Sequence, residues 1–194
     1  MAWIIILGVL LVAVIYGVSV YNALQTLLTQ IEASIQEIGN QLKRQANLIP
    51  NLQSSVKAFL KQEKSIFKML TDARKSVEAA VEDTTGESIE KVERQINQIL
   101  PKLQVVMEDN PELKSNETIQ QFMAELRDTA DKLTYARRAL IDLTQNYNQK
   151  LVTFPSNLVA NVFSFKKQKG LATPMSGEHV SVSESETRDV KVDL

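Results

Sequence analysis

The stretch that decides the fold is WIIILGVLLVAVIYGVSVY, residues 3–21, which carries no charged side chain and continues into a patterned segment without a turn signal. An α-helix rises about 1.5 Å per residue, so this stretch covers about 28 Å, close to the ~30 Å hydrocarbon core of a bilayer. Trp3 and Tyr21 lie at its two ends, where amphipathic aromatic rings favour the membrane interface. We therefore predict a transmembrane anchor over residues 1–21, with Trp3 and Tyr21 at the two interfaces.

A cleavable signal peptide is the main alternative for this stretch. A signal peptide has a basic first segment and a cleavage site between small residues. Met1 and Ala2 carry no basic side chain, and the sequence after Tyr21 remains typical of a helix. These features favour a retained anchor.

Composition excludes several classes of function. The chain has no Cys and one His, His179, so it has no disulfide, no thiolate metal site and no multi-histidine metal site. Its 22 basic and 23 acidic residues give a net charge of −1, which argues against general nucleic-acid binding. We expect no cofactor, no metal, no nucleic-acid partner and no small-molecule substrate.

Four apolar stripes follow the anchor, each with residues three or four positions apart. This heptad-like spacing is typical of amphipathic helices that pack together as in coiled coils, and strand-type alternation is absent. The stripes run over residues 24–42, 52–80, 89–106 and 119–151.

Turn and capping signals separate these stripes. Pro50 fits the first turn of a second helix, so residues 48–50 predict the first bend. Thr84 and Glu87 form a capping box for the third helix, residues 109–111 end it, Ser115 caps the fourth helix and Pro155 stops it. Short connections make sequential helices antiparallel neighbours. The predicted fold is all-α: a transmembrane helix that continues into an antiparallel up-down four-helix bundle over residues 22–154.

One stripe position is acidic. Glu63 lies between Phe59 and Ile66, and burying an unpaired carboxylate is costly. We expect Glu63 to pair with Arg127 or Arg137 on the fourth helix. Two interpretations stay open: a structural contact that sets the register of the helices, or a catalytic or ion-binding carboxylate.

Residues 155–169 predict a short amphipathic helix followed by a basic patch. A second membrane contact and packing against the membrane-proximal end of the bundle are equal alternatives for this segment. The residues expected at the membrane surface are Phe163, Phe165, Lys166, Lys167 and Lys169.

The last segment, residues 170–194, is acidic and rich in Ser, with few apolar side chains. Such a segment cannot bury enough surface to become ordered, so we predict a disordered tail. Because His179 lies in this tail, a solvated imidazole is expected there rather than a ligand or a catalytic base.

Several short motifs resemble the LemA family. The most specific is QLKRQANLIPNL, residues 41–52; Tyr21-Asn22, Tyr147-Asn148 and Phe154-Pro155-Ser156-Asn157 continue the match, which covers roughly residues 20–165. Gln62 stands where the family usually has His. The resemblance implies a bacterial single-pass membrane protein with its N-terminus outside, a cytoplasmic helical bundle and no established enzymatic activity.

No catalytic arrangement emerges from the sequence. A Ser-His-Asp triad would need His179, and no phosphate-binding glycine motif is present. We expect no enzyme, but a scaffold or interaction module in cell-envelope or membrane organisation. The alternative is an adaptor subunit of a membrane protease or transporter complex. The expected partners are the lipid bilayer and further copies of the chain or other membrane proteins, at the bacterial cell membrane.

Overall fold

The computed structural model describes residues 2–57 and 64–171, and every regular element in these ranges is an α-helix. The all-α prediction is confirmed for this part of the chain. The predicted disordered tail, apart from Gly170 and Leu171, and Glu63 lie outside the described residues. The helices are α1 (Ala2–Val56), α2 (Lys64–Glu82), α3 (Gly86–Asp109), α4 (Pro111–Lys114), α5 (Glu117–Val152) and α6 (Ser156–Val162).

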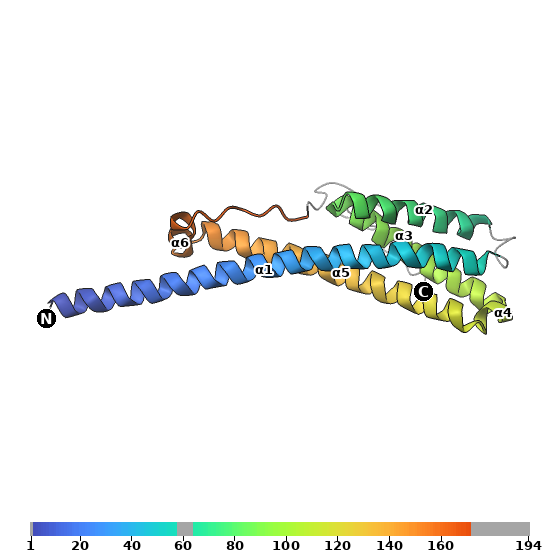
Figure 1. Ribbon diagram of the computed structural model, residues 1–194, viewed down its shortest axis with the longest axis horizontal. Coiled ribbons are helices and arrows are strands. Elements are labelled where there is room, and N and C mark those ends of the chain that lie inside the picture. The colour runs from blue at the N-terminus through green and yellow to red at the C-terminus, as the bar shows by residue number, and fades with distance from the viewer. Residues whose placement is uncertain (1, 58–63, 172–194) are drawn as a thin grey trace, which may run out of the picture.

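Helix α1 has two parts with different surroundings. From Trp3 to Val18 its large apolar side chains are exposed, and in Figure 1 this part extends past the other described helices. From Leu24 onward the same helix buries a stripe of apolar residues. Among the described residues, α1 is the one helix that is long and apolar enough to cross a membrane.

The bend expected at residues 48–50 is wrong, because α1 continues through Pro50 to Val56. Proline removes one backbone donor from a helix. However, Ile49, Leu52 and Val56 extend the buried stripe of α1 at unchanged spacing. Burying a large apolar side chain contributes about 1.5–3 kcal/mol, so three such residues offset the lost hydrogen bond.

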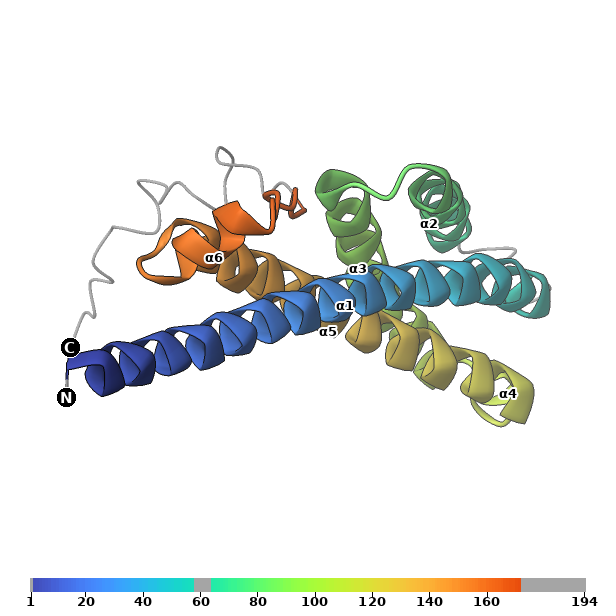
Figure 2. The same cartoon turned by 60° about the vertical axis from the view of Figure 1, so that its left-hand side comes forward.

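The part of α1 from Leu24 onward packs with α2, α3 and α5, and these segments together are called the helical body. Leu27 shares a surface pocket with Asn146 and Lys150 of α5, whereas Arg44 lies 3.9 Å from Asp128 in the first third of α5. Low-numbered residues of α1 therefore lie beside high-numbered residues of α5. Figures 1 and 2 show α2 beside the later part of α1, while α3 crosses behind α1 toward α4 and the start of α5.

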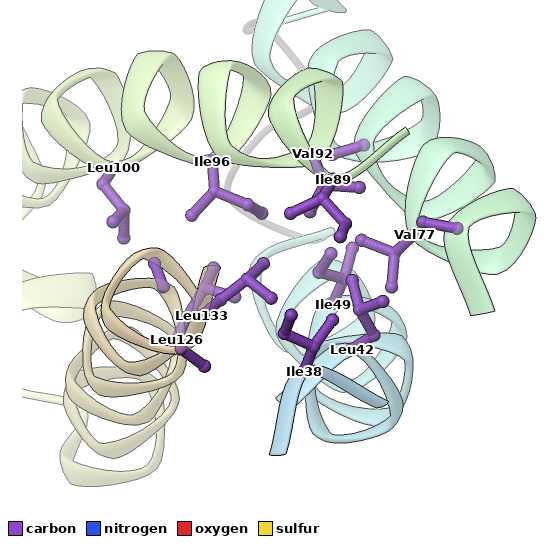
Figure 3. Packing of buried hydrophobic residues seen from close by; sticks show 14 of the residues in the cluster. Ile38, Leu42, Ile49, Val77, Ile89, Val92, Ile96, Leu100, Leu126 and Leu133 are labelled. Atoms are coloured by element: carbon purple, nitrogen blue, oxygen red, sulfur yellow. The ribbon is translucent and has the colours of Figure 1, made fainter. Parts of the chain in front are cut away.

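The core of the helical body is a continuous apolar cluster. Figure 3 shows side chains from all four of these helices converging on it. Since successive stripe residues point to one face of each helix, their spacing in the sequence is what places them here. The residues labelled in Figure 3 include Ile38, Leu42 and Ile49 of α1, Val77 of α2, Ile89 and Ile96 of α3, and Leu126 and Leu133 of α5.

Helix ends lie close to their predicted positions. Thr85, rather than Thr84, caps α3. The Ser88 amide donates to the Thr85 hydroxyl and the Thr85 amide donates to the Ser88 hydroxyl, which together form a capping box. Helix α3 ends at Asp109, as predicted. Asn116, rather than Ser115, caps α5 by accepting a hydrogen bond from the Ile119 amide at 3.2 Å.

Candidate functional site

The candidate site is the junction where the uncovered part of α1 meets the helical body. Helix α6 lies at this end, next to the last turn of α5 (Figure 1). The Ser156 hydroxyl fixes α6 in place by donating to the carbonyls of Lys150, at 2.7 Å, and Thr153, at 2.9 Å. The Lys150 carbonyl is one that the end of α5 leaves without a partner inside the helix, whereas the Thr153 carbonyl also accepts from the Asn157 amide at 2.8 Å.

The chain reverses direction at the end of α6. The Phe165 amide donates to the Ala160 carbonyl at 2.9 Å, and the Ser164 amide donates to the Asn161 carbonyl at 3.2 Å. Ser164 has a φ of 55°. This pair of bonds around a left-handed residue is a Schellman motif, which usually has glycine at that position. It directs Phe165 back toward α1.

Tyr21 is the point of contact between α6 and α1. Its ring centroid lies 4.8 Å from that of Phe163 and 5.6 Å from that of Phe165, with both pairs tilted by nearly 60°. Tilted aromatic pairs at these separations are attractive. Phe165 also packs against the core, whereas Phe163 remains exposed. The structure therefore brings together a predicted interface residue and two predicted surface residues.

After Phe165 the chain runs back along α5 as an extended segment, residues 166–171, called the strap. The Tyr147 hydroxyl donates to the Lys166 carbonyl at 3.1 Å. The Asn148 amide donates to the Gln168 carbonyl at 2.9 Å and accepts from the Gln168 amide at 3.0 Å. Tyr147 is buried, and this burial raises the pKa of its phenol above the ordinary value of about 10.

Lysines lie near the junction. Lys166, Lys167 and Lys169 are exposed on the strap, with Lys169 farthest from the junction beside Ile35, and Lys150 lies on the last turn of α5. No acidic residue occurs in residues 143–171 or in residues 2–31. Both segments that build the junction therefore contribute positive or uncharged side chains.

Exposed apolar side chains also gather at this end, and they are called the α6 face. Leu158 and Val162 lie one turn apart on α6, opposite its buried residues Ser156 and Ala160. Val152 and Phe154 precede residues 155–169, the segment from which a membrane contact was expected. The members are Val152, Phe154, Leu158, Val162 and Phe163.

A second polar cluster lies inside the helical body. Arg137 of α5 donates to Glu93 at 2.9 Å and to Glu90 at 3.4 Å, and all three side chains are at most one-fifth exposed. Arg127 instead donates to Gln104 at 3.3 Å on the surface. Glu63 lies outside the described residues, so its pairing stays a prediction.

The Arg137 cluster joins two helices, because Glu90 and Glu93 belong to α3. With a guanidinium already between its carboxylates, the cluster has the composition of a structural ion pair. In the described ranges, no group of three or more His, Asp or Glu side chains is arranged to hold a metal ion.

An uncovered apolar helix that continues into a helical body places this chain among the membrane-associated all-α proteins. Residues 21–183 match the model of the LemA family, and the chain belongs to this family. It is also 25% identical over 170 residues to the magnetosome protein MamQ of Magnetospirillum gryphiswaldense. That match covers 76% of this chain and 62% of MamQ, so the chain spans less than two thirds of the relative's length.

The short motifs that carry the LemA resemblance meet at the junction. Tyr21 contacts the phenylalanines after α6, Tyr147 and Asn148 bind the strap, and Ser156 begins α6. These residues come from three separate parts of the sequence. The longer motif at residues 41–52 lies instead within α1 in the helical body, where Leu42, Ile49 and Leu52 are buried.

Proposed function

We propose that this protein is a non-catalytic, single-pass membrane scaffold or interaction module, whose helical body is an antiparallel up-down four-helix bundle. The observation that carries the proposal is the continuity of α1. One helix forms both the uncovered apolar segment and a buried stripe of the helical body. A body joined to its anchor without a flexible linker is held at a defined orientation to the membrane, which suits the presentation of surfaces to partners.

Contacts between helices support the antiparallel bundle. Gln53, near the end of α1, donates to Thr71 in the first half of α2 at 2.9 Å. Arg137 in the second half of α5 binds Glu93 in the first half of α3. Both contacts have the order expected when consecutive long helices run in opposite directions.

The distribution of lysines supports a cytoplasmic helical body with the N-terminus of α1 outside. Basic residues near a span favour the cytoplasmic side. Lys150, Lys166 and Lys167 lie toward the end of the helical body from which the uncovered part of α1 extends, whereas Lys169 lies farther along the strap, in a pocket with Ile35 and Thr84. MamQ is named for the magnetosome, and from this likeness we infer that the present chain serves a cell structure rather than a metabolic reaction.

Site-specific cross-linking in native membranes tests the scaffold. The chain has no Cys, so single cysteines can be introduced without background. Tyr135→Cys places a thiol on α5 beside a surface groove formed with α1, and Val105→Cys is a matched exposed control on α3. A short bifunctional reagent is applied, and the products are sized after mild solubilisation.

A homo-oligomeric series from Tyr135→Cys supports the scaffold. A product with a different membrane protein at a fixed ratio supports the adaptor alternative and contradicts a self-assembling scaffold. A monomer at both positions, with no co-purifying protein, contradicts both functions.

A further inference from the structure

We propose that the α6 face is seated in the surface of the bilayer, with Lys166 and Lys167 of the strap on anionic lipid headgroups. This inference rests on the proposed anchoring by α1 and adds a second, monotopic contact to it. The partner is a lipid surface: acyl chains just below the headgroups for the apolar side chains, and phosphate groups for the lysines.

The depth of α6 follows from its contact with Tyr21. Tyr21 ends the uncharged stretch that begins at Trp3, so it marks the interface on the side of the helical body. Phe163 lies 4.8 Å from it between ring centroids. The outer side of α6 therefore lies at the depth of the lipid headgroups. Figure 2 shows α6 at the end of the helical body from which the uncovered part of α1 extends.

The exposure of the α6 face is unusual for this molecule. Phe154 is 78% exposed and Val162 is 77% exposed, and they lie close together in the sequence with three further apolar residues. Elsewhere in the described helical body, exposed large apolar side chains are scattered singly. These are Ile35, Val81, Val105 and Tyr135. A gathered apolar surface indicates an interaction site, whereas single exposed residues do not.

The sequence left two alternatives for residues 155–169, a membrane contact and packing against the bundle. Opposite sides of this segment correspond to the two alternatives. Ala160 and Phe165 pack inward against the helical body. Leu158 and Val162 point away from it. Packing against the body thus orients α6 so that its outer side faces the membrane, and Phe165 belongs to the packed side rather than to the lipid contact.

Charge favours the lipid surface over a second protein copy as the occupant. Lys150 precedes the α6 face in the sequence, Lys166 and Lys167 follow it, and residues 143–171 contain no acid. Two copies meeting through this face would bring like charges together, whereas anionic headgroups neutralise them.

Fluorescence quenching by brominated lipids tests the contact in the full-length protein. Trp3 is the only tryptophan of the chain, so the wild type reports insertion of the anchor. In a Trp3→Phe background, Val162→Trp and Phe154→Trp report the α6 face, and Tyr135→Trp is an exposed control on α5. The proteins are reconstituted into vesicles of phosphatidylcholine and phosphatidylglycerol with bromine near the top of the acyl chains.

We expect Val162→Trp and Phe154→Trp to lose most of their fluorescence, as Trp3 does, while Tyr135→Trp keeps its intensity. Replacing Lys166 and Lys167 by Gln should weaken the quenching of the tryptophan at position 162, whereas Lys169→Gln should leave it unchanged, because Lys169 lies beside Ile35 and Thr84. Replacing phosphatidylglycerol by phosphatidylcholine should also weaken this quenching.

Each other result has a distinct meaning. If Trp3 is quenched but positions 154 and 162 are not, the surface contact is overturned and the anchor stands. If Trp3 itself is not quenched, the anchoring in the proposed function fails. If positions 154 and 162 resist both brominated lipid and aqueous acrylamide, a protein covers the α6 face and the lipid contact is refuted.

Discussion

Single polar residues inside the helical body differ in how well they are paired. Arg137 is held by two carboxylates of α3. Gln45, by contrast, is 0% exposed, and neither of its side-chain polar atoms has a hydrogen-bond partner among the described residues. Its position continues the apolar stripe of α1 between Leu42 and Ile49, so a polar amide occupies a place that packing assigns to an apolar side chain.

Replacing Gln45 by Leu should therefore stabilise the protein. An unsatisfied buried polar group costs about 1–3 kcal/mol, and the Gln45→Leu variant should gain that much in free energy of unfolding. Chemical unfolding in detergent, followed by circular dichroism, measures the change. Gln41→Leu is the control and should gain less, because Gln41 donates to Glu37 at 2.6 Å. An unchanged or lower stability for Gln45→Leu would show that its amide is paired.

Replacing Arg137 by Met should be costly, because Glu90 and Glu93 would remain largely buried without a counter-charge. Breaking a buried pair from one side costs about 3 kcal/mol. Unfolding of Arg137→Met, with and without Glu93→Leu, measures this cost, and the double variant should recover part of it. Arg127→Met, which loses only a surface bond to Gln104, should change stability by about 0.5 kcal/mol or less. Equal losses for the two arginine variants would contradict this assignment.

Tyr147 should make the strap sensitive to alkaline pH. Its folded-state pKa is raised by burial, so the neutral phenol is favoured in the folded state. That contribution to stability is complete below about pH 10, the ordinary tyrosine pKa, and is lost as pH rises through the raised value. Unfolding midpoints from pH 8 to 12 should fall more steeply in the wild type than in Tyr147→Phe. Parallel curves would rule the tyrosine out as the cause.

At the scale of helices, the spacing of apolar residues was a good predictor of helical segments. The backbone hydrogen bonds that start or end a helix could not be predicted from the sequence. The stripes over residues 24–42, 89–106 and 119–151 each lie within one helix, whereas the stripe over residues 52–80 begins in α1 and ends in α2. The Asn-Pro sequence after Asp109 correctly ended α3. The break at Pro50 was wrong because continued burial of the α1 stripe outweighs one lost bond. Apparent capping residues were displaced by one position, since neighbouring Thr, Ser and Asn side chains compete for the same amides.

The junction shows the same limit. The sequence placed its lysines and phenylalanines in one segment, residues 155–169, but the inward packing of Phe165 was not predicted. The strap was not predicted, because it is held by Tyr147 and Asn148 side chains bound to backbone groups of residues 166–168, and such bonds leave no periodic signal. The partners of Arg137 were missed because Glu90 and Glu93 lie beside the α3 stripe rather than on it.

The end of α6 allows a test at this scale. Ser164 adopts a left-handed conformation that costs a residue with a Cβ about 1 kcal/mol relative to glycine. Ser164→Gly should therefore slow hydrogen exchange of the Phe165 amide, which is bonded to the Ala160 carbonyl. Ser164→Val should speed that exchange. If both variants exchange like the wild type, the turn does not control the stability of this segment.

At the scale of the whole molecule, the uninterrupted α1 sets how far the protein stands from the membrane. A helix rises about 1.5 Å per residue, so the part of α1 from Asn22 to Val56 spans about 50 Å. With Tyr21 at the interface, the opposite end of the helical body is held at that height. A flexible connection would instead let the body lie on the surface.

Neutron reflectometry on a supported bilayer should thus show a protein layer about 50 Å thick, the helical length of residues 22–56. Inserting four glycines between Tyr21 and Asn22 should thin the layer, because the body is then free to tilt. A wild-type layer of about 20–25 Å, the width of two packed helices, would contradict the upright arrangement.

The long pairing of α1 with α5 also bears on how the protein is made. Helix α1 leaves the ribosome first, and α5, which covers its buried stripe, follows after α2, α3 and α4. Until α5 is made, the apolar stripe of α1 remains exposed, because contacts between residues far apart in the sequence form late. Chains held side by side in one membrane meet in this half-made state, where the α5 of one copy can close on the α1 of its neighbour. The density of newly made chains in the membrane therefore governs how many molecules pair α1 with their own α5 and how many pair it with the α5 of a neighbouring copy.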